Sequence, residues 1–338
     1  MLLHLPQVAN IVQPVCIVIL FLLCVCVFVM MFVSASSTHL TRAAFPIQPS
    51  LDIIGTGKPS NAKGELRWPW GVAFHNNNHT IAVTDQCNNR IEFFSQDCKF
   101  ISSFGSRGTN NSQFNYPCGI CCPNDGSNNL IVSDCHRVQV FHVDSSSSLQ
   151  HLFSIGSSQS GNANNQFYNP YGVDCTVGGI IMVADTFNNR IEMFDVKGKF
   201  IRSVGSQGSN DNQFQGLYDV CVHNNTQQMM VADYNNDRVS VWSADGSQHI
   251  HTLPLAGRAS PSGICIDPHT QHVVVSCDGS HDVRVLDVKT SNGQLVQQIG
   301  QQGSQPGQFN NPTGVCIDDR GVLIVADFEW RYQRVQLF

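Results

Sequence analysis

The chain has 338 residues, which is enough for one large repeat domain or two ordinary domains. Only 13% of the residues are charged and the formal net charge is −6, so no overall basic field points to nucleic acid. Of its 14 cysteines, three lie in a first apolar segment, and the remaining 11 are an odd number, which argues against a complete disulfide framework.

Residues 15–33 form an uninterrupted apolar run. As a helix it would span roughly 28 Å, close to the hydrocarbon thickness of a bilayer. We expect a retained transmembrane helix there, within an N-terminal segment 1–36 that is followed by a linker at 37–50. A cleavable signal peptide is the alternative, because small residues at 33–35 could form a cleavage site. Since no Lys or Arg precedes the run and Arg42 follows it, the positive-inside rule favours a single-pass membrane protein whose remaining chain is cytoplasmic rather than extracellular.

A repeated motif fills residues 51–338. Its clearest copies are VTDQCNNRIEFF, VADTFNNRIEMF and VADYNNDRVSVW, each of which reads as a strand, an Asp, a polar turn, an Arg and a second strand. Three weaker copies bring the number to six. A short strand ending in Gly follows most copies, these glycines recur about 50 residues apart, and a Pro-x-Gly step then opens another strand. Each repeat therefore supplies four strands, d, a, b and c in chain order, and six such repeats predict a six-bladed β-propeller.

The ends of the repeat region predict how the ring closes. The chain stops after a c strand, so the last blade lacks its own outer strand, whereas 51–55 is a d strand with no preceding blade. We expect 51–55 to pair with 334–338, which leaves no incomplete blade edge. The fourth copy of the Pro-x-Gly step, LYDVCV at 217–222, has neither residue, so we expect an irregular loop there.

These repeats resemble the NHL-repeat family of six-bladed propellers. The motifs that carry the resemblance are FGSRGTNNSQFNYPCGI, IGQQGSQPGQFNNPTGVCID and VADTFNNRIEMF. The family includes the C-terminal propellers of some tripartite-motif proteins, which bind single-stranded RNA or protein partners, and it is similar to the fold of an amidating lyase, a zinc enzyme. The resemblance implies a binding propeller over 51–338. A role in ubiquitin-ligase assemblies would need the RING, B-box and coiled-coil parts to come from elsewhere.

An Asp ends strand b and an Arg opens strand c in most copies. A ring of catalytic carboxylates is one interpretation. We favour a structural brace, in which the carboxylate caps the turn amides and pairs with the Arg, because catalysis rarely needs five copies of one group. Blade five has Cys277 and Asp282 at these positions and is expected to lack the brace. The predicted pairs are Asp85–Arg90, Asp134–Arg137, Asp185–Arg190, Asp233–Arg238 and Asp327–Arg334.

Cysteines recur at one position of strand a, namely Cys121, Cys221, Cys265 and Cys316, with Ala73 in blade one. A metal ring is conceivable, but symmetric blade positions are too far apart to share one tetrahedral ion, and a free Cys packs as a small hydrophobe. No set of His residues gathers at the strand a openings, where the lyase resemblance would require zinc ligands. We therefore predict no catalytic residue, no metal and no cofactor.

The d–a and b–c loops share one face of the ring, because successive strands alternate in direction. The residue between Pro and Gly turns into the channel on this face, and in blades one, three and four it is Trp70, Tyr171 or Tyr218. Aromatic residues at such a mouth fill a partner's groove, or they wedge adjacent loops together.

Basic and aromatic residues of the same face belong to blades six, one and two, which ring closure makes adjacent. With the three channel-mouth aromatics they form the predicted partner-binding set, although a charge-neutralised solvated rim is the plainer interpretation. The additional members are Lys63, Arg67, Trp68, Arg107, His136, Trp330, Arg331 and Tyr332. The sequence thus predicts a membrane-anchored, non-catalytic scaffold for protein partners, with no small-molecule substrate. A reader of single-stranded RNA is the alternative, and a lyase-like zinc enzyme is the second alternative.

Overall fold

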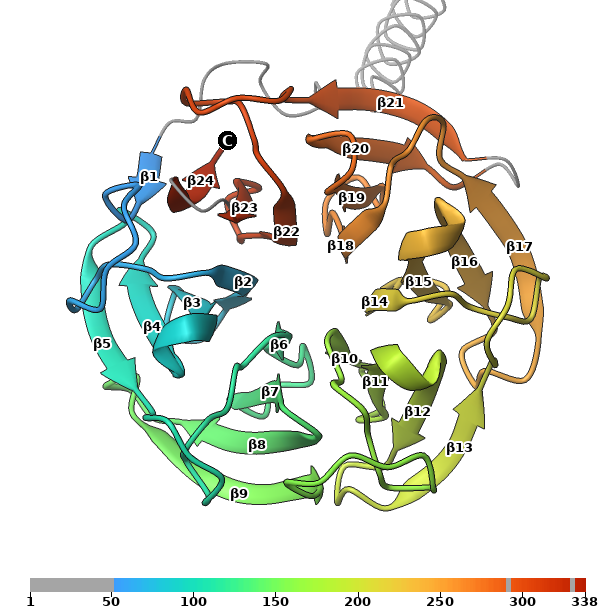
Figure 1. Cartoon of the computed structure of the whole chain (residues 1–338), viewed down its shortest axis with the longest axis horizontal. Coiled ribbons are helices and arrows are strands. Elements are labelled where there is room, and N and C mark those ends of the chain that lie inside the picture. The colour runs from blue at the N-terminus through green and yellow to red at the C-terminus, as the bar shows by residue number, and fades with distance from the viewer. Residues whose placement is uncertain (1–51, 290–292, 329–331) are drawn as a thin grey trace, which may run out of the picture. The chain divides into compact units, whose positions relative to one another are not determined.

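The computed structural model describes residues 52–289, 293–328 and 332–338. In this part the chain forms six four-stranded antiparallel sheets, arranged as blades around a central channel (Figure 1). The prediction of an all-β, six-bladed propeller is confirmed. The predicted transmembrane helix at 15–33 and the linker at 37–50 lie outside the described residues. Among the residues that are described, no helix has the length and apolar character needed to cross a membrane.

The strands of each blade follow one another outward from the channel. Their bounds are β2 (Pro69–His75), β3 (Thr80–Asp85), β4 (Arg90–Ser95) and β5 (Phe100–Phe104) in blade one; β6 (Ile120–Cys121), β7 (Asn129–Asp134), β8 (Arg137–Val143) and β9 (Leu149–Gly156) in blade two; β10 (Val173–Cys175), β11 (Ile181–Asp185), β12 (Arg190–Phe194) and β13 (Phe200–Val204) in blade three; β14 (Leu217–Val222), β15 (Met229–Asp233), β16 (Arg238–Trp242) and β17 (His249–Pro254) in blade four; β18 (Pro261–Ile266), β19 (Val273–Cys277), β20 (Asp282–Asp287) and β21 (Gln294–Ile299) in blade five; and β22 (Pro312–Ile317), β23 (Leu323–Phe328), β24 (Gln333–Leu337) and β1 (Asp52–Ile54) in blade six.

The first and last strands close the ring, as predicted. In Figure 1 the first described strand, β1, lies beside the last, β24. They pair antiparallel, with Asp52 opposite Leu337 and Ile54 opposite Val335. Ile54 is 1% exposed and packs in the core between blades six and one. The chain end is thereby held by backbone hydrogen bonds and by buried apolar surface.

The core consists of apolar layers between neighbouring blades. Because successive side chains of a strand point to opposite faces, Phe93 packs toward blade two while Phe94 packs toward blade six. Ala82 and Ile81 divide between the same two layers. The central strands are therefore apolar on both faces, which explains their continuous runs of Val, Ile, Ala and Phe.

The polar loop after most d strands folds back on the glycine that ends the strand. In the loop of blade four, Phe214 is fully buried and lies against Gly205, which has φ +83°. A Cβ on Gly205 would stand 2.2 Å from the Phe214 ring, so this position requires glycine. The same Gly–Phe contact recurs at Gly105 with Phe114 and at Gly300 with Phe309, so the recurrence of Gly and Gln-Phe in these loops is a packing requirement.

Blade four corrects one expectation, because its loop is as regular as the others. β14 begins at Leu217, and its pairing with β15 shows the same shift near the start that β2, β18 and β22 show with their partners. Gly216 supplies the positive φ that the residue before the Pro adopts in the other five blades. The Pro-x-Gly residues are therefore not needed for the path of this loop.

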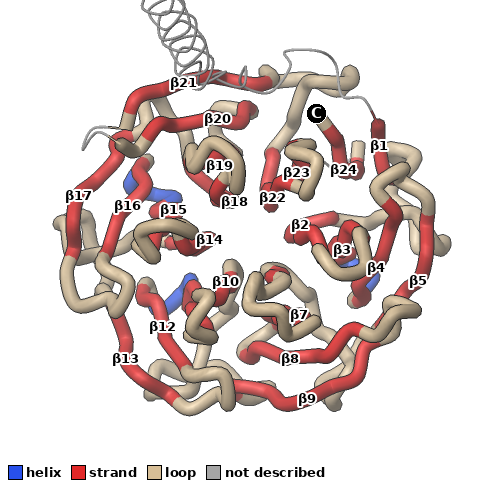
Figure 2. The backbone as a smooth tube through the Cα atoms, turned by 180° about the vertical axis from the view of Figure 1, so that it is seen from behind, coloured by secondary structure: helices blue, strands red, loops and turns tan. Residues whose placement is uncertain are grey.

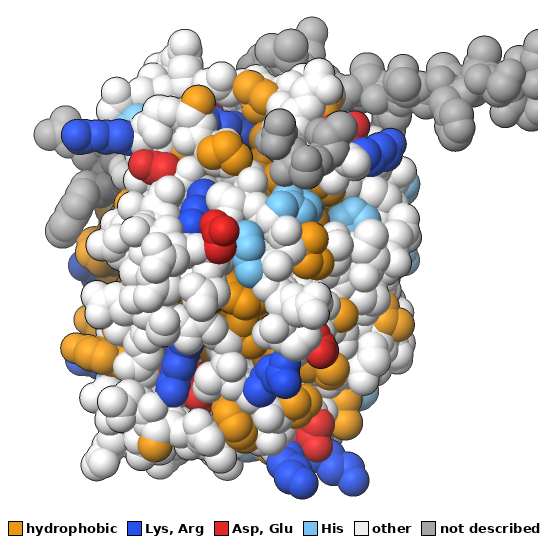
Figure 3. All heavy atoms as spheres, turned by 90° about the vertical axis from the view of Figure 1, so that its right-hand side faces the viewer, with side chains coloured by type: hydrophobic (Ala, Val, Ile, Leu, Met, Phe, Trp, Pro, Cys, Tyr) orange, Lys and Arg blue, Asp and Glu red, His pale blue; other side chains and the backbone are white. Residues whose placement is uncertain are grey.

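Short helical turns form three corners on one face of the ring. Three 3-10 turns, η1 (Gln86–Asn88), η2 (Thr186–Asn188) and η3 (Tyr234–Asn236), form b–c corners (Figure 2). On the β17 side, the rim is mostly uncharged, with cationic and anionic side chains interspersed (Figure 3). The candidate site therefore has to be sought in the loops and the channel.

Candidate functional site

Each Asp at the end of strand b fixes the d–a loop of its own blade. In blade one, Asp85 accepts hydrogen bonds from the backbone N–H of Arg67 at 2.6 Å and from Nε of Arg90 at 2.8 Å. Arg90 also donates to the loop carbonyls of Ala62 and Glu65. The other four predicted pairs form the same contact, at 2.7–3.1 Å, so the brace is confirmed.

Blade five has a shifted version of this brace. Arg284 lies two residues into β20, and its Nε is 3.2 Å from Oδ1 of Asp282. The guanidinium also donates to the loop carbonyl of Ala256 at 2.8 Å. Strand b of blade five ends at Cys277 and lacks the carboxylate, as expected, but Arg284 further along strand c still reaches the d–a loop, which was not expected.

A second set of hydrogen bonds joins neighbouring blades on the same face. The residue before the Pro of each Pro-x-Gly step, or before Leu217 in blade four, has a positive φ, and its backbone N–H donates to a side chain of the preceding blade. Asn169 donates to Nδ1 of His136 at 3.2 Å, and Gly216 donates to Oδ1 of Asn189 at 2.7 Å. We call these contacts the interblade staples. The remaining four are Trp68 to Gln333, Tyr116 to Asn89, Ser260 to Asp237 and Asn311 to His281.

The three predicted channel-mouth aromatics meet one another, although they come from blades one, three and four. The ring centroid of Trp70 is 5.1 Å from that of Tyr171 and 6.1 Å from that of Tyr218, and the two tyrosine rings are 5.1 Å apart. The Gly119 N–H donates to the Tyr171 carbonyl at 3.0 Å, and a Cβ on Gly119 would stand 2.1 Å from that oxygen. The Pro-x-Gly glycine therefore lets the next blade place its aromatic residue at the mouth.

The aromatic cluster extends outward from these three rings. Tyr234 stacks on Tyr218 with centroids 4.1 Å apart, and Phe187 lies 6.2 Å from Tyr171. Burial raises the pKa of Tyr218, as expected for a half-buried phenol. Phe187 is 51% exposed, so the outer edge of the cluster is open to solvent. Further members are Tyr168 beside Phe187, and Phe328 between Trp68 and Trp70.

The described basic residues of the predicted set lie in the d–a loops of blades one and two. Lys63, Arg67 and Arg107 are exposed, and none of them forms an ion pair with another described residue. Tyr332 is 40% exposed. Trp330 and Arg331 lie outside the described residues.

His136 is part of the structure of the face rather than a free cation on it. Its Nδ1 accepts the staple hydrogen bond from Asn169, and its ring lies 5.8 Å from that of Tyr168. Burial lowers the pKa of His136. We therefore separate His136 from the basic residues of the predicted set.

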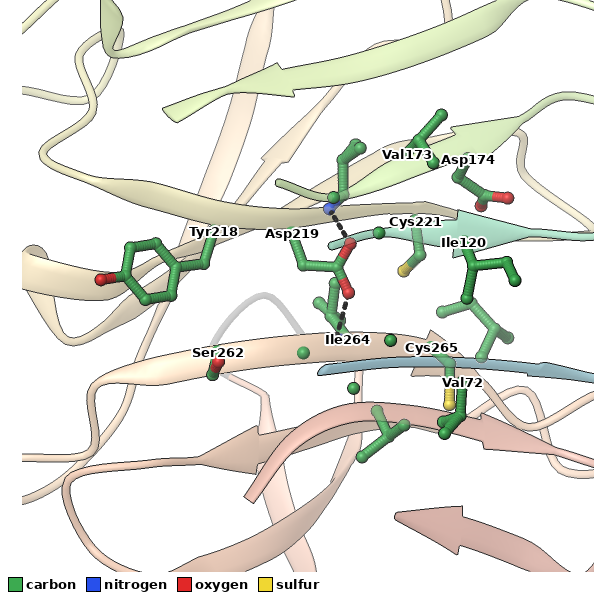
Figure 4. A pocket seen from close by; sticks show the side chains of 18 of the residues that line it. Val72, Ile120, Val173, Asp174, Tyr218, Asp219, Cys221, Ser262, Ile264 and Cys265 are labelled. Carbon is green, nitrogen blue, oxygen red and sulfur yellow. Dashed lines mark hydrogen bonds between the residues drawn. The ribbon is translucent and has the colours of Figure 1, made fainter. Parts of the chain in front are cut away.

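The channel contains two carboxylates that the sequence reasoning missed. A cavity of about 180 Å³ begins at Trp70 and Tyr218 and is lined by the innermost strands (Figure 4). Asp219 accepts from the N–H groups of Val220 and Ile264, each at 2.9 Å, and thereby joins β14 to β18. Burial, with a further contribution from the charge of Asp174, raises the pKa of Asp219 to about 8.

Asp174 performs the same joining function one blade earlier. Its Oδ2 accepts from the Val222 N–H at 2.9 Å, and its Oδ1 accepts from the Cys121 thiol at 3.1 Å. Burial raises the pKa of Asp174. The available signal was positional: Asp219 stands where the other blades have Gly, and Asp174 stands at the position of the recurring cysteines.

The recurring cysteines are packing residues, as predicted. Cys121 and Cys221 are buried in interblade layers, and all 11 cysteines of the described residues are free. Burial raises the pKa of Cys221 well above its usual value, so the thiol stays protonated. No group of three His, Cys, Asp or Glu residues within the described ranges is placed to hold a metal ion.

Comparison with known proteins agrees with this architecture. Residues 162–265 match a family described as a 6-bladed beta-propeller, and residues 309–336 match the NHL repeat family. The chain is similar to the Drosophila melanogaster protein brain tumor, with 28% identity over 136 residues, 40% of this chain and 13% of the relative. It is also similar to the human E3 ubiquitin-protein ligase TRIM32, with 25% identity over 255 residues, 69% of this chain and 37% of the relative.

Two further similarities concern enzymes. The rat peptidylglycine alpha-amidating monooxygenase is 29% identical over 150 residues, which is 42% of this chain and 15% of that protein. The streptogramin B lyase structure superposes with a TM-score of 0.55 and 11% identity, over 85% of this chain and 97% of that chain, which shows a shared fold alone. The chain spans 37% or less of each of the three curated relatives. The repeated motifs, the six closed blades and the two family matches together identify the chain as a six-bladed β-propeller with NHL repeats.

Proposed function

We propose that this propeller is a non-catalytic scaffold that binds protein partners on its d–a/b–c face. The observation that carries the proposal is the aromatic cluster around Trp70, Tyr171 and Tyr218, whose outer members remain exposed. Solvent-exposed aromatic side chains on a rigid frame are typical of interface hot spots, because they bury much apolar area at a small loss of conformational freedom. The braces and interblade staples supply that rigid frame.

The charge of the chain supports a protein partner over a nucleic acid. A net charge of −6 gives no general attraction for phosphates. No Lys or Arg lines the described cavity beneath the aromatic cluster. The similarity to TRIM32, which is named as an E3 ubiquitin-protein ligase, supports a place in ubiquitin-ligase-type assemblies.

Single-stranded RNA is the alternative partner, and one observation favours it. Lys63, Arg67 and Arg107 are exposed on the same side of the ring as the aromatic cluster. Proteins that bind single strands combine cationic grooves with aromatic stacking platforms. The lyase-like alternative is tested by metal analysis of the purified chain, since stoichiometric zinc would contradict a non-catalytic scaffold.

We also propose that the scaffold is held at a membrane by residues 15–33 with the propeller in the cytoplasm. The support is the apolar run and the position of Arg42 after it. N-terminal sequencing of the mature protein and a glycosidase shift assay test this placement. A mature start near Ser36, or a glycan on Asn78, Asn110 or Asn224, would contradict it.

Site-specific photo-crosslinking tests the proposed face. A benzoylphenylalanine at Phe187, which is 51% exposed beside the cluster, should crosslink proteins in cells. The matched control is the same group at Val177, which is 56% exposed in an a–b turn on the opposite face. Crosslinked species that survive nuclease treatment at Phe187 and are absent at Val177 support the proposal. Species that nuclease destroys would favour RNA.

A further inference from the structure

A small cavity opens beside the aromatic cluster, at the junction of blades one, two and three. It has a volume of about 220 Å³ and is separate from the central channel. Tyr116, Pro170 and Tyr171 supply apolar walls, and no charged side chain lines it. The remaining lining residues are Gln86, Cys118, Cys135 and Asn169. A neutral group with a flat apolar body therefore fits this cavity better than a phosphate or an ammonium group.

Two polar groups in the cavity have weak partners. Gln86 is 7% exposed, and its Nε2 donates to the Sγ atom of Cys118 at 3.1 Å. The Oδ1 atom of Asn169 accepts from the Cys135 thiol at 3.6 Å. Sulfur is a weak acceptor and a thiol is a weak donor. The amides of Gln86 and Asn169 would therefore form stronger hydrogen bonds with an oxygen-bearing group than with these sulfur atoms.

The cavity walls are fixed before any ligand arrives. The N–H of Tyr116 is held by Oδ1 of Asn89 at 3.0 Å, and the N–H of Asn169 is held by His136. Tyr116 has φ 55°, a costly backbone conformation for a bulky residue that the surrounding bonds maintain. A ligand therefore binds without ordering these loops, which preserves its affinity.

We propose that this cavity binds a tyrosine side chain of the partner protein, an inference that rests on the proposed function of the face. The phenol ring packs between Tyr116 and Tyr171, and its hydroxyl accepts from Gln86 Nε2 and donates to Asn169 Oδ1. A hydroxyl group has the one donor and the acceptor capacity that the two amides require. A phenylalanine side chain would fill the same cavity but would leave both amides bonded to their sulfur partners.

Alkylation of Cys135 reports occupancy, because this thiol lines the cavity and is partly exposed. The full chain is treated with iodoacetamide at pH 8.5, and modification of each cysteine is followed by mass spectrometry. The probe is N-acetyl-L-tyrosinamide, compared with N-acetyl-L-phenylalaninamide, both at about 10 mM because a single side chain binds in the millimolar range. Cys98, which follows β4 in a c–d turn, is the internal control thiol, and because burial raises its pKa to about 11, its modification is followed over a longer time than that of Cys135.

The proposal predicts that the tyrosine probe slows Cys135 modification at least a few-fold more than the phenylalanine probe and leaves Cys98 unchanged. Gln86→Leu should abolish the difference between the probes, and Cys118→Phe, which fills the cavity, should abolish protection by both. Equal protection by the two probes, or none, would overturn the proposal, and protection by uridine or adenosine alone would replace it with a nucleobase pocket. The two proposals can fail separately. If alanine variants of Trp70, Tyr171 and Tyr218 lose a protein partner while neither probe protects Cys135, the proposed function stands and the tyrosine pocket fails.

Discussion

The backbone N–H of Asn169 donates a hydrogen bond to Nδ1 of His136, 3.2 Å away. This contact ties the d–a loop of blade three to the b–c turn of blade two. A backbone N–H can only donate, so Nδ1 has to be unprotonated for the bond to exist. Protonation would place two donors against each other, and burial of the ring lowers the pKa of His136 accordingly.

Acidification should therefore weaken the junction of blades two and three. The folded-state pKa lies below the value of about 6.5 in the unfolded chain, so the unfolded state binds more protons between these two values. Stability from this group is present above pH 6.5 and falls as the pH drops toward the folded-state pKa. His136→Asn retains an acceptor, as Asn189 does in blade three, but does not titrate. Between pH 7.5 and 5.0 its melting temperature should fall less than that of the wild type, and parallel shifts would contradict the assignment.

Ring closure by β1 predicts a difference between two adjacent isoleucines. Ile54 is 1% exposed, whereas the neighbouring Ile53 is only half-buried. Truncation of a buried Ile typically costs 2–5 kcal/mol, so Ile54→Ala should lower the free energy of unfolding by about 2 kcal/mol or more. Ile53→Ala should cost clearly less. Denaturant unfolding measures both, and equal effects would show that β1 contributes little buried surface to closure.

Asp219 predicts a pH dependence of the opposite sign. Its pKa is about 8 in the folded channel and near 3.9 in an unfolded chain. The folded state binds the extra proton between these values, so the contribution of Asp219 to stability declines as the pH rises from about 4 to about 8. Asp219→Asn resembles the protonated form and should remove this decline. From pH 5.0 to pH 8.5 the melting temperature of the wild type should fall more than that of Asp219→Asn. An equal fall in both proteins would rule out this role.

The exposed arginines distinguish the two partner classes. For a protein partner, Arg67→Gln and Arg107→Gln should mainly slow association, because rim charges steer the encounter. For single-stranded RNA, each lost phosphate contact should reduce the slope of log affinity against log salt by roughly 0.7. Lys197→Gln, in a c–d turn on the opposite face, is a control of equal charge change. A salt slope that falls with each arginine but not with Lys197→Gln would favour RNA.

The repeated features of this fold could be read from the sequence because they recur. Six copies of one motif predicted the blades, the Asp–Arg braces and the closure by β1. The interblade staples were not predicted, since Asn189, Asp237 and His281 share no side-chain chemistry beyond an acceptor atom. Two departures from the repeat were also misjudged. Gly216 gives the blade-four loop the usual path without the Pro-x-Gly step, and Arg284, two residues into strand c, reaches the d–a loop of blade five in place of the missing Arg.

The candidate site was predicted in part for the same reason. The positions of Trp70, Tyr171 and Tyr218 follow from blade symmetry, but their contact across the channel depends on how far each ring reaches. Exposed Phe187 and Tyr116 were not predicted. Phe187 lies in a 3-10 corner and Tyr116 has a positive φ, and the orientation of neither side chain follows from the repeat pattern. The sequence shows that Asp219 stands where the other blades have Gly. It does not show that the carboxylate accepts a hydrogen bond from Ile264 of the next blade.

The affinity of one protein partner for variants of the aromatic cluster tests the central claim most directly. The partner is one captured through crosslinking at Phe187, and affinity is measured for the wild type, for Trp70→Ala with Tyr171→Ala and Tyr218→Ala, and for a control with Val177→Ala and Val196→Ala, two residues exposed on the opposite face. Melting curves check that each variant is folded. The triple variant should bind about thirty-fold more weakly or worse, which corresponds to a hot-spot loss of about 2 kcal/mol, and the control should bind like the wild type. Unchanged affinity of the triple variant, together with a loss in the control, would contradict the assignment of the binding face.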